Sequence, residues 1–208
     1  MAGKEGIDQY QNIWQKFVDG DVEALSSIYF EFFDILLNFG MKYSTDRSLV
    51  EDCIQNVFLD LLKNRQKQKP VSNIRFYLIK AIKNQLSYEK RKAKRLISVD
   101  NPGEADFRIC YSAEKSFIAS ETDKMRTRFL KMVINDLTDH QKEALYLKFN
   151  CGFDYIQISE LMQISVESTR TLIYRTLKSI KETFGTEDNL TLILLGLFQS
   201  DRNFTSGS

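Results

Sequence analysis

Apolar residues recur at steps of three and four along the first half of the chain, which is the spacing of one buried face of an α-helix. Four successive stretches show this pattern and predict four helices. Asp19-Gly20-Asp21 ends the first, and a polar loop over 64–72 precedes the fourth. The expected inward-facing residues run from Tyr10 to Phe17, from Leu25 to Tyr43, from Val50 to Leu61 and from Ile74 to Leu86.

The pattern is lost over 98–122, where Asn101-Pro102-Gly103 is a turn signal, and it returns near Thr122. This interruption predicts a linker between two sets of helices. We therefore predict an all-α protein of two small helical domains joined by a flexible linker. The expected limits are 8–96 for the first domain, 97–122 for the linker, 123–185 for the second domain and 186–208 for an apolar C-terminal tail.

Two helices predicted at 155–162 and 166–184 are separated by three residues, a spacing typical of a helix-turn-helix. Thr138 and Asp154 are each followed three residues later by glutamine, as in a capping box, and Ser165 is the expected cap of the last helix. Short polar side chains near the start of this helix and cations further along suit a recognition helix in the major groove. A helix pair with a polar face is the alternative. The outward residues are Ser168, Arg170, Thr171, Tyr174, Arg175, Lys178 and Lys181.

The net charge of +1 conceals an uneven distribution of charged residues. Residues 1–62 hold 4 basic and 11 acidic side chains, a net charge of −7. Residues 63–95 hold 12 basic side chains and 1 acidic one, a net charge of +11, and residues 96–208 hold 13 and 16, a net charge of −3. A basic block of this density typically meets a polyanion such as nucleic acid. A solvated helix face is the alternative interpretation.

The predicted fourth helix, inside this basic block, interleaves aromatic and basic residues. Because bases stack on aromatic rings and phosphates bind cations, this face suits single-stranded nucleic acid. Phe76 and Tyr77 are alternatively core aromatics. The third helix carries acidic and amide side chains from Glu51 to Asp60, which suit a basic protein surface. The outward residues of the fourth helix are Phe76, Lys80, Lys83, Asn84, Ser87 and Arg91, with Arg75 and Tyr77 beside them.

Several functional classes are disfavoured. Cys53, Cys110 and Cys151 are widely spaced and odd in number, which predicts buried thiols in a reducing compartment. No CxxC pair or glycine-rich phosphate loop occurs and His140 is the single histidine, so we expect no metal site, no cofactor and no enzymatic activity. The chain has no signal-like start, and its longest apolar stretch, 190–198, is too short for a membrane span. A cytoplasmic protein without membrane insertion is expected.

The segment 46–61, DRSLVEDCIQNVFLDL, resembles region 2.2 of the extracytoplasmic-function sigma factors. Residues 73–84 resemble regions 2.3 and 2.4, residues 137–143 resemble the opening of region 4, and residues 155–175 resemble its helix-turn-helix. The likeness covers most of both expected domains in the right order, and the basic helix is similar to that of the Bacteroidetes branch. Trp14, Gly20-Asp21, Ala24-Leu25 and Tyr29 match the family's opening helices.

The resemblance implies a sigma factor, which binds core RNA polymerase and directs promoter recognition, melting and transcription initiation at a specific regulon. The implied partners are promoter DNA and core polymerase, through its clamp helices and flap, with an anti-sigma factor as a further candidate. Glu51, Asp52, Gln55 and Asn56 would bind core polymerase. The −10 element would contact Asn73, Arg75, Phe76, Tyr77, Lys80, Lys83, Asn84 and Arg91. The −35 element would contact Ser165, Glu167, Ser168, Arg170, Thr171, Tyr174, Arg175 and Lys178.

Four positions depart from the family's pattern. Asn56 replaces a usual glutamate, and Tyr88 lies near the place of a usual aspartate, which bears on contact details. Gln163 replaces the turn glycine, and Leu172 stands where arginine is frequent, which bears on the promoter sequence. The alternatives are a helix-turn-helix regulator that binds duplex DNA without polymerase-subunit function, and a degenerate homologue that no longer starts transcription. The regulator leaves the acidic third helix and the basic fourth helix unexplained.

In the tail, apolar residues would share one side of a short amphipathic helix. This stripe either packs against the second domain or forms a docking site for an anti-sigma segment or the polymerase flap. Its residues are Leu190, Ile193, Leu194, Leu197 and Phe198.

Overall fold

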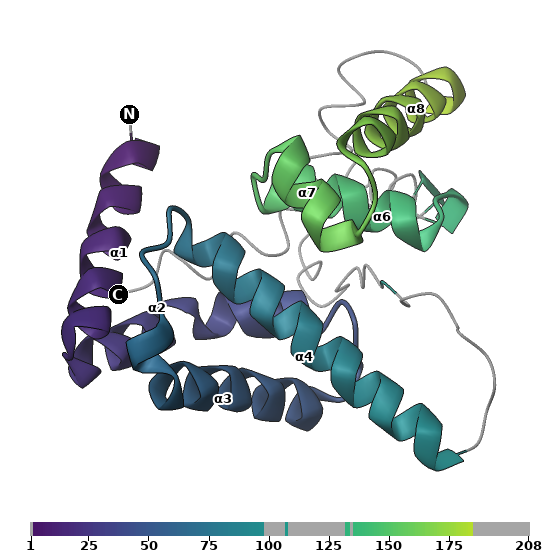
Figure 1. Ribbon diagram of the computed structural model, residues 1–208. Coiled ribbons are helices and arrows are strands. Elements are labelled where there is room, and N and C mark those ends of the chain that lie inside the picture. Colours follow the sequence, from purple (N-terminus) through teal and green to yellow (C-terminus); the bar gives the residue numbers. More distant parts are fainter. Residues whose placement is uncertain (1, 98–106, 108–131, 134, 185–208) are drawn as a thin grey trace, which may run out of the picture. The chain divides into compact units, whose positions relative to one another are not determined.

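The computed structural model describes residues 2–97, 107, 132, 133 and 135–184. Regular structure in these residues is helical, without a strand, which confirms the predicted all-α class. Contacts divide the chain into two compact units, Met1–Glu104 and Ala105–Ser208, which are described separately (Figure 1). The predicted tail and most of the predicted linker lie outside the described residues. None of the described helices combines the length and apolar character of a membrane span.

In its described residues, the first unit has four α-helices: α1 (Ala2–Asp19), α2 (Val22–Gly40), α3 (Arg47–Lys63) and α4 (Ile74–Ile97). A short 3-10 helix, η1 (Arg65–Lys67), lies in the loop between α3 and α4. Helix α2 packs against the other three, and Figure 1 shows it passing behind α4. Helices α3 and α4 also pack against each other, so all four contribute to one core.

Short polar side chains fix where these helices begin. The Asp21 carboxylate accepts hydrogen bonds from two backbone N–H groups at the start of α2, and Asp46 accepts one from Leu49 at the start of α3. Asn73 Oδ1 accepts a 2.9 Å bond from the Phe76 N–H at the start of α4. Each bond satisfies a donor that the first helical turn leaves free.

Large apolar side chains fill the centre of the first unit. Trp14, Phe17, Leu36, Ile54 and Leu78, drawn from all four helices, are almost fully buried. Helices α2 and α3 approach closely at Gly40, where a Cβ atom would lie 2.3 Å from Val50 Cγ1. Glycine at this position therefore lets the two helices pack.

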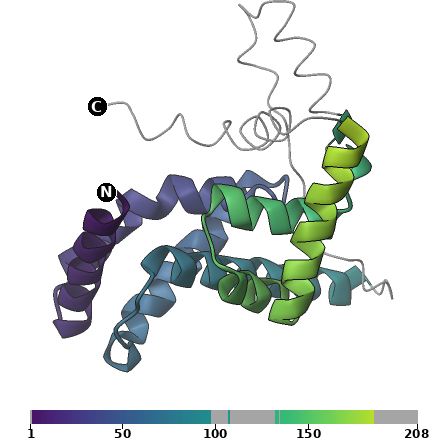
Figure 2. The same ribbon diagram turned by 90° about the horizontal axis from the view of Figure 1, so that it is seen from above.

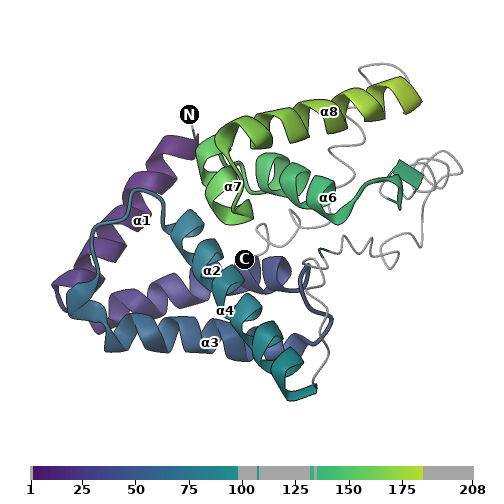
Figure 3. The same ribbon diagram turned by 45° about the vertical axis from the view of Figure 1, so that its right-hand side comes forward.

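The second unit contains α6 (Asp139–Leu145), a π-helix η3 (Tyr146–Asn150), α7 (Tyr155–Met162) and α8 (Val166–Phe184) among its described residues. Figure 2 shows α8 as the long yellow-green helix, and Figure 3 shows α6 and α7 lying along it. The helix that begins after Thr138 does not stay α-helical to its end. Its last turn widens into the π-helix, with Cys151 N–H bonded to the Tyr146 carbonyl at 3.1 Å.

Both predicted capping boxes are present. Thr138 Oγ1 accepts from the Gln141 N–H at 3.3 Å, and Gln141 Oε1 accepts from the Thr138 N–H at 2.9 Å. The same reciprocal pair joins Asp154 and Gln157, at 2.8 and 3.1 Å. Helix α7 is joined to α8 by the three-residue turn 163–165, which confirms the predicted helix-turn-helix.

The turn between α7 and α8 is strained. Gln163 adopts φ 56° and ψ 40°, the left-handed region, in which a side chain costs about 1–2 kcal/mol. Glycine avoids this cost, although ordering its more flexible backbone on folding costs about 0.5–1 kcal/mol more than for other residues. Gln163→Gly should therefore raise the melting temperature of the second unit by several degrees, since about 1 kcal/mol corresponds to roughly 4–8 °C. Calorimetry would measure this, and Gln163→Ala, which keeps the strain, should show no such rise.

One residue of the predicted linker belongs to the core of the second unit. Phe107 is fully buried, and its ring lies 5.5 Å from that of Tyr146, between centroids, at 55°. The lost apolar pattern and the turn signal predicted a flexible linker over 97–122, and neither signal singles out one phenylalanine. At Phe107 the chain is therefore anchored to the second unit.

Candidate nucleic-acid interface

Helix α4 carries a basic face. Asn84 and Arg91 are exposed, and Arg75, Lys80 and Lys83 are partly exposed. Lys83 Nζ lies 5.6 Å from the centroid of the buried Tyr43 ring, so the aromatic core of the unit holds this cation in place. The face combines fixed positive charge with an exposed amide, which suits phosphates and base edges.

The two aromatic candidates on α4 differ in setting. Tyr77 packs edge-on against Trp14, with ring centroids 5.2 Å apart, and its hydroxyl donates a 3.1 Å bond to Gln68 Oε1. Burial raises the pKa of Tyr77 above its ordinary value. Phe76 is partly exposed. Tyr77 therefore belongs in large part to the core, as the alternative interpretation held. The side chain of Phe76 remains partly accessible to solvent.

The loop before α4 is tied to α1. Trp14 Nε1 donates a 3.0 Å bond to the Lys69 carbonyl, and Gln11 Nε2 donates a 2.8 Å bond to the Ser72 carbonyl. Arg65 reaches the Val18 carbonyl at 3.4 Å. These bonds fix a basic loop beside the basic face of α4.

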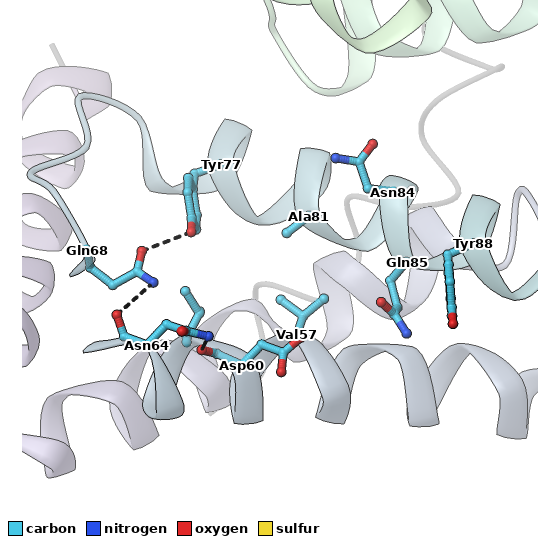
Figure 4. Close-up of a pocket in the computed structure, with 10 residues that line it drawn as sticks. Val57, Asp60, Asn64, Gln68, Tyr77, Ala81, Asn84, Gln85 and Tyr88 are labelled. Atoms are coloured by element: carbon cyan, nitrogen blue, oxygen red, sulfur yellow. Dashed lines mark hydrogen bonds between the residues drawn. The ribbon is translucent and has the colours of Figure 1, made fainter. Parts of the chain in front are cut away.

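A pocket of about 530 Å³ opens between α3, this loop and α4 (Figure 4). Figure 4 shows Tyr77, Gln85 and Tyr88 pointing towards α3, whereas the Asn84 amide points away from it. Gln68, which accepts from Tyr77, also donates to the Asn64 carbonyl at 3.4 Å. The pocket is rich in amide and phenol groups, which bind base edges. Its polar lining residues are Asp60, Asn64, Gln68, Tyr77, Asn84, Gln85 and Tyr88.

The candidate polymerase-binding residues lie on α3. Asp52, Gln55 and Asn56 are exposed, while Glu51 is partly buried and paired with Arg47 at 2.7 Å. Gln55 also lines an apolar hollow of about 370 Å³ between α2 and α3. Phe30, which is 79% exposed, lies at this hollow. The polar face of α3 thus continues into an apolar surface.

Helix α8 separates a buried from an exposed side as the sequence predicted. Thr169, Ile173 and Ile180 are buried, and Thr171 is partly exposed. Ser165 Oγ accepts a 3.0 Å bond from the Ser168 N–H, which confirms it as the cap. The exposed candidates are Ser165, Glu167, Ser168, Arg170, Tyr174, Arg175 and Lys178.

The candidate residues thus form one group on α3, one on α4 and one on α8. Sequence reasoning missed most of the pocket lining, and also Lys148 and Tyr155, which lie near Arg170 in the second unit. An aromatic residue at the first position of α7 is a weak signal by itself. The cations that contact it come from two other elements, η3 and α8, so spacing in the sequence does not show the contact.

The described cysteines behave as ordinary buried thiols. Cys53 and Cys151 are buried thiols outside any disulfide, and desolvation raises the pKa of Cys53 to about 11. Within the described ranges, no group of three His, Cys, Asp or Glu side chains is placed to hold a metal ion.

Comparison with known proteins identifies both units. The family model of sigma-70 region 2 matches residues 31–96, and that of sigma-70 region 4 matches residues 130–180. A search among curated proteins found no match. The chain therefore carries region 2 followed by region 4, the domain pair typical of extracytoplasmic-function sigma factors. It functions as a sigma factor, a class of DNA-recognition subunit, and the regulator alternative does not account for its region 2 domain.

A solved structure shares this fold. The sigma factor RpoE from Bartonella quintana, in co-crystal with the anti-sigma factor NepR, superposes with a TM-score of 0.54. The two chains are 18% identical, and the match covers 77% of this chain and 96% of that one. At this identity the likeness concerns the fold.

Proposed function

We propose that this sigma factor divides its work among the three faces: α3 binds core polymerase, α4 with its pocket holds the melted −10 strand, and α8 reads the −35 duplex. The observation that carries the proposal is the separation of charge within the first unit. The outward side of α3 presents Asp52, Gln55 and Asn56, whereas α4 presents Lys80, Lys83 and Arg91. Opposite charges on adjacent helices suit two different partners.

For the −10 element, the proposed strand lies along α4. Arg91 and the neighbouring lysines neutralise phosphates, and the pocket beside Tyr77 receives an unstacked base. Its phenol and amide groups offer both hydrogen-bond donors and acceptors to a base. Bases that leave the DNA stack would instead stack on the rings of Tyr88 and Phe76. Arg75 adds a further cation whose Nε is buried without a hydrogen-bond partner.

Charge reversal on α3 tests the polymerase face. Asp52→Arg should weaken binding to core polymerase at least about tenfold, because like charges across an interface cost several kcal/mol. Its effect on folding should stay within about 0.5 kcal/mol, since the side chain is exposed. Quantitative pull-down with core polymerase measures the change. Asp19→Arg, an exposed acid at the end of α1, is the matched control, and equal binding by both variants would remove α3 from the interface.

Two alanine substitutions separate the DNA faces. Arg175→Ala should weaken binding to the −35 duplex by about 1–3 kcal/mol and leave melting of a pre-bound promoter intact. Asn84→Ala should spare duplex binding and reduce permanganate reactivity of the −10 region. Duplex affinity that falls equally in both variants would contradict the division between α4 and α8.

The remaining proposals concern context. RpoE of Bartonella quintana was crystallised with an anti-sigma factor, which supports an anti-sigma partner for this chain as well. We propose that the polymerase flap contacts the second domain, that the protein is cytoplasmic, and that it belongs to the Bacteroidetes-like branch. We also keep 8–96 and 123–185 as the limits of the two DNA-binding domains.

A further inference from the structure

Two cations converge on one aromatic ring in the second unit. Lys148 Nζ lies 4.5 Å from the centroid of the Tyr155 ring, and Arg170 Cζ lies 5.6 Å from it. Both distances are within the roughly 6 Å range of a cation–π contact. Neither Lys148 nor Tyr155 belongs to the residues assigned above to the −35 element.

The three residues come from three elements: Lys148 from η3, Tyr155 from α7 and Arg170 from α8. The capping box of Asp154 fixes the residue directly before Tyr155. Lys148 Nζ also donates to the Phe153 carbonyl at 3.4 Å. The ring and this carbonyl therefore hold the two cations near each other despite their repulsion.

These cations are not neutralised within the described residues, because neither Lys148 nor Arg170 forms an ion pair there. The sum of their distances to the ring places the two charged groups within about 10 Å of each other. Arg170 is exposed, and the other two side chains are partly exposed, so an anion can approach from solvent.

We propose that Lys148 and Arg170 together bind the phosphate backbone of the −35 duplex, and that Tyr155 is the residue that positions them. This rests on the proposed function of α8. In a helix-turn-helix the first helix, here α7, crosses the DNA backbone while the second enters the major groove. Cations gathered at the start of α7 thus lie where phosphates pass. In this arrangement Arg170 contacts phosphate. Arg175 and the short polar residues of α8 contact the base edges and so recognise the sequence.

The test measures binding of the reconstituted holoenzyme to a duplex bearing the −35 element, selected by the wild-type protein, between about 50 and 200 mM salt. Loss of one phosphate contact lowers the slope of log affinity against log salt by about 0.9. Lys148→Ala should show this loss and weaken binding equally to altered −35 sequences. The ratio of wild-type affinity to Lys148→Ala affinity should therefore fall about 3.5-fold as salt rises across this range.

Variants of Tyr155 test positioning. Tyr155→Leu should lower affinity about two- to fivefold, the equivalent of an exposed cation–π contact, whereas Tyr155→Phe keeps the ring and should bind as wild type. If Tyr155→Leu lowers the melting temperature of the second unit, its binding result reflects folding, and the salt slope of Lys148→Ala alone tests the phosphate site. A wild-type salt slope for Lys148→Ala would overturn the proposal.

Arg175→Ala in the same assay separates this proposal from the proposed function. Duplex binding that is unaffected by Arg175→Ala would contradict the role of α8 itself. Loss of affinity in Arg175→Ala together with an unchanged Lys148→Ala would keep that role and reject the phosphate site.

Discussion

Trp14→Ala is expected to destabilise the first unit by about 3–5 kcal/mol, the usual cost of removing a large buried aromatic side chain. Trp14 is almost fully buried, and its ring contacts those of Phe17 and Tyr77. The substitution also frees the Lys69 carbonyl, which Trp14 Nε1 holds at 3.0 Å. A loss of this size is a large part of the stability of a small domain. Calorimetry of the full chain should show an early transition for this unit.

Two further variants separate folding from loop position. Trp14→Phe keeps most of the apolar surface and loses the hydrogen bond, at about 0.5–1.5 kcal/mol, so trypsin should cleave faster after Lys67 while the unit stays folded. Phe30→Ala removes an aromatic ring that is exposed and should change stability by less than about 0.5 kcal/mol. Equal melting of Trp14→Ala and Phe30→Ala would contradict the described core.

Phe107→Ala should destabilise the second unit by about 3–5 kcal/mol, although Phe107 lies far from the helix-turn-helix in sequence. The ring is fully buried against Tyr146 at the start of the π-helix. Because η3 precedes α7 and packs against it, we also expect weaker −35 binding. Calorimetry and duplex binding of the full chain measure both effects.

The control for this variant is Ile156→Ala, which removes an exposed apolar side chain of α7 and should leave the melting temperature nearly unchanged. A Phe107→Ala protein that melts like wild type would show that the anchor contributes nothing to the fold. The expected contrast is a shift of more than 10 °C for Phe107→Ala alone, at roughly 4–8 °C for each kcal/mol.

The sequence was most informative where a local signal decides the structure. Helix α3 spans the predicted inward-facing residues from Val50 to Leu61, and the boxes at Thr138 and Asp154 formed as expected. Such signals act within a few residues, so they depend little on the rest of the fold. The exposed side of α8 could be read for the same reason, because helical periodicity fixes which residues share a face.

Contacts between distant residues were harder to predict. Nothing local marks Phe107 for burial, and the pocket beside Tyr77 exists because Trp14 and Gln68 fix the loop from two sides. The wider turn at 146–150 is likewise set by packing, since its residues have the same apolar spacing as an ordinary α-helix. The contact of Tyr155 with Lys148 and Arg170 depends on the packing of three elements, η3, α7 and α8, and is not visible in the sequence.

Run-off transcription with core RNA polymerase tests the central claim most directly. Templates would be promoters selected from genomic DNA by the protein together with core polymerase. We expect transcripts that start at defined positions and require this chain, with Asp52→Arg and Asn84→Ala both reducing their yield. Specific binding of the chain to duplex DNA without any dependent transcript, on any selected template, would contradict its function as a sigma factor.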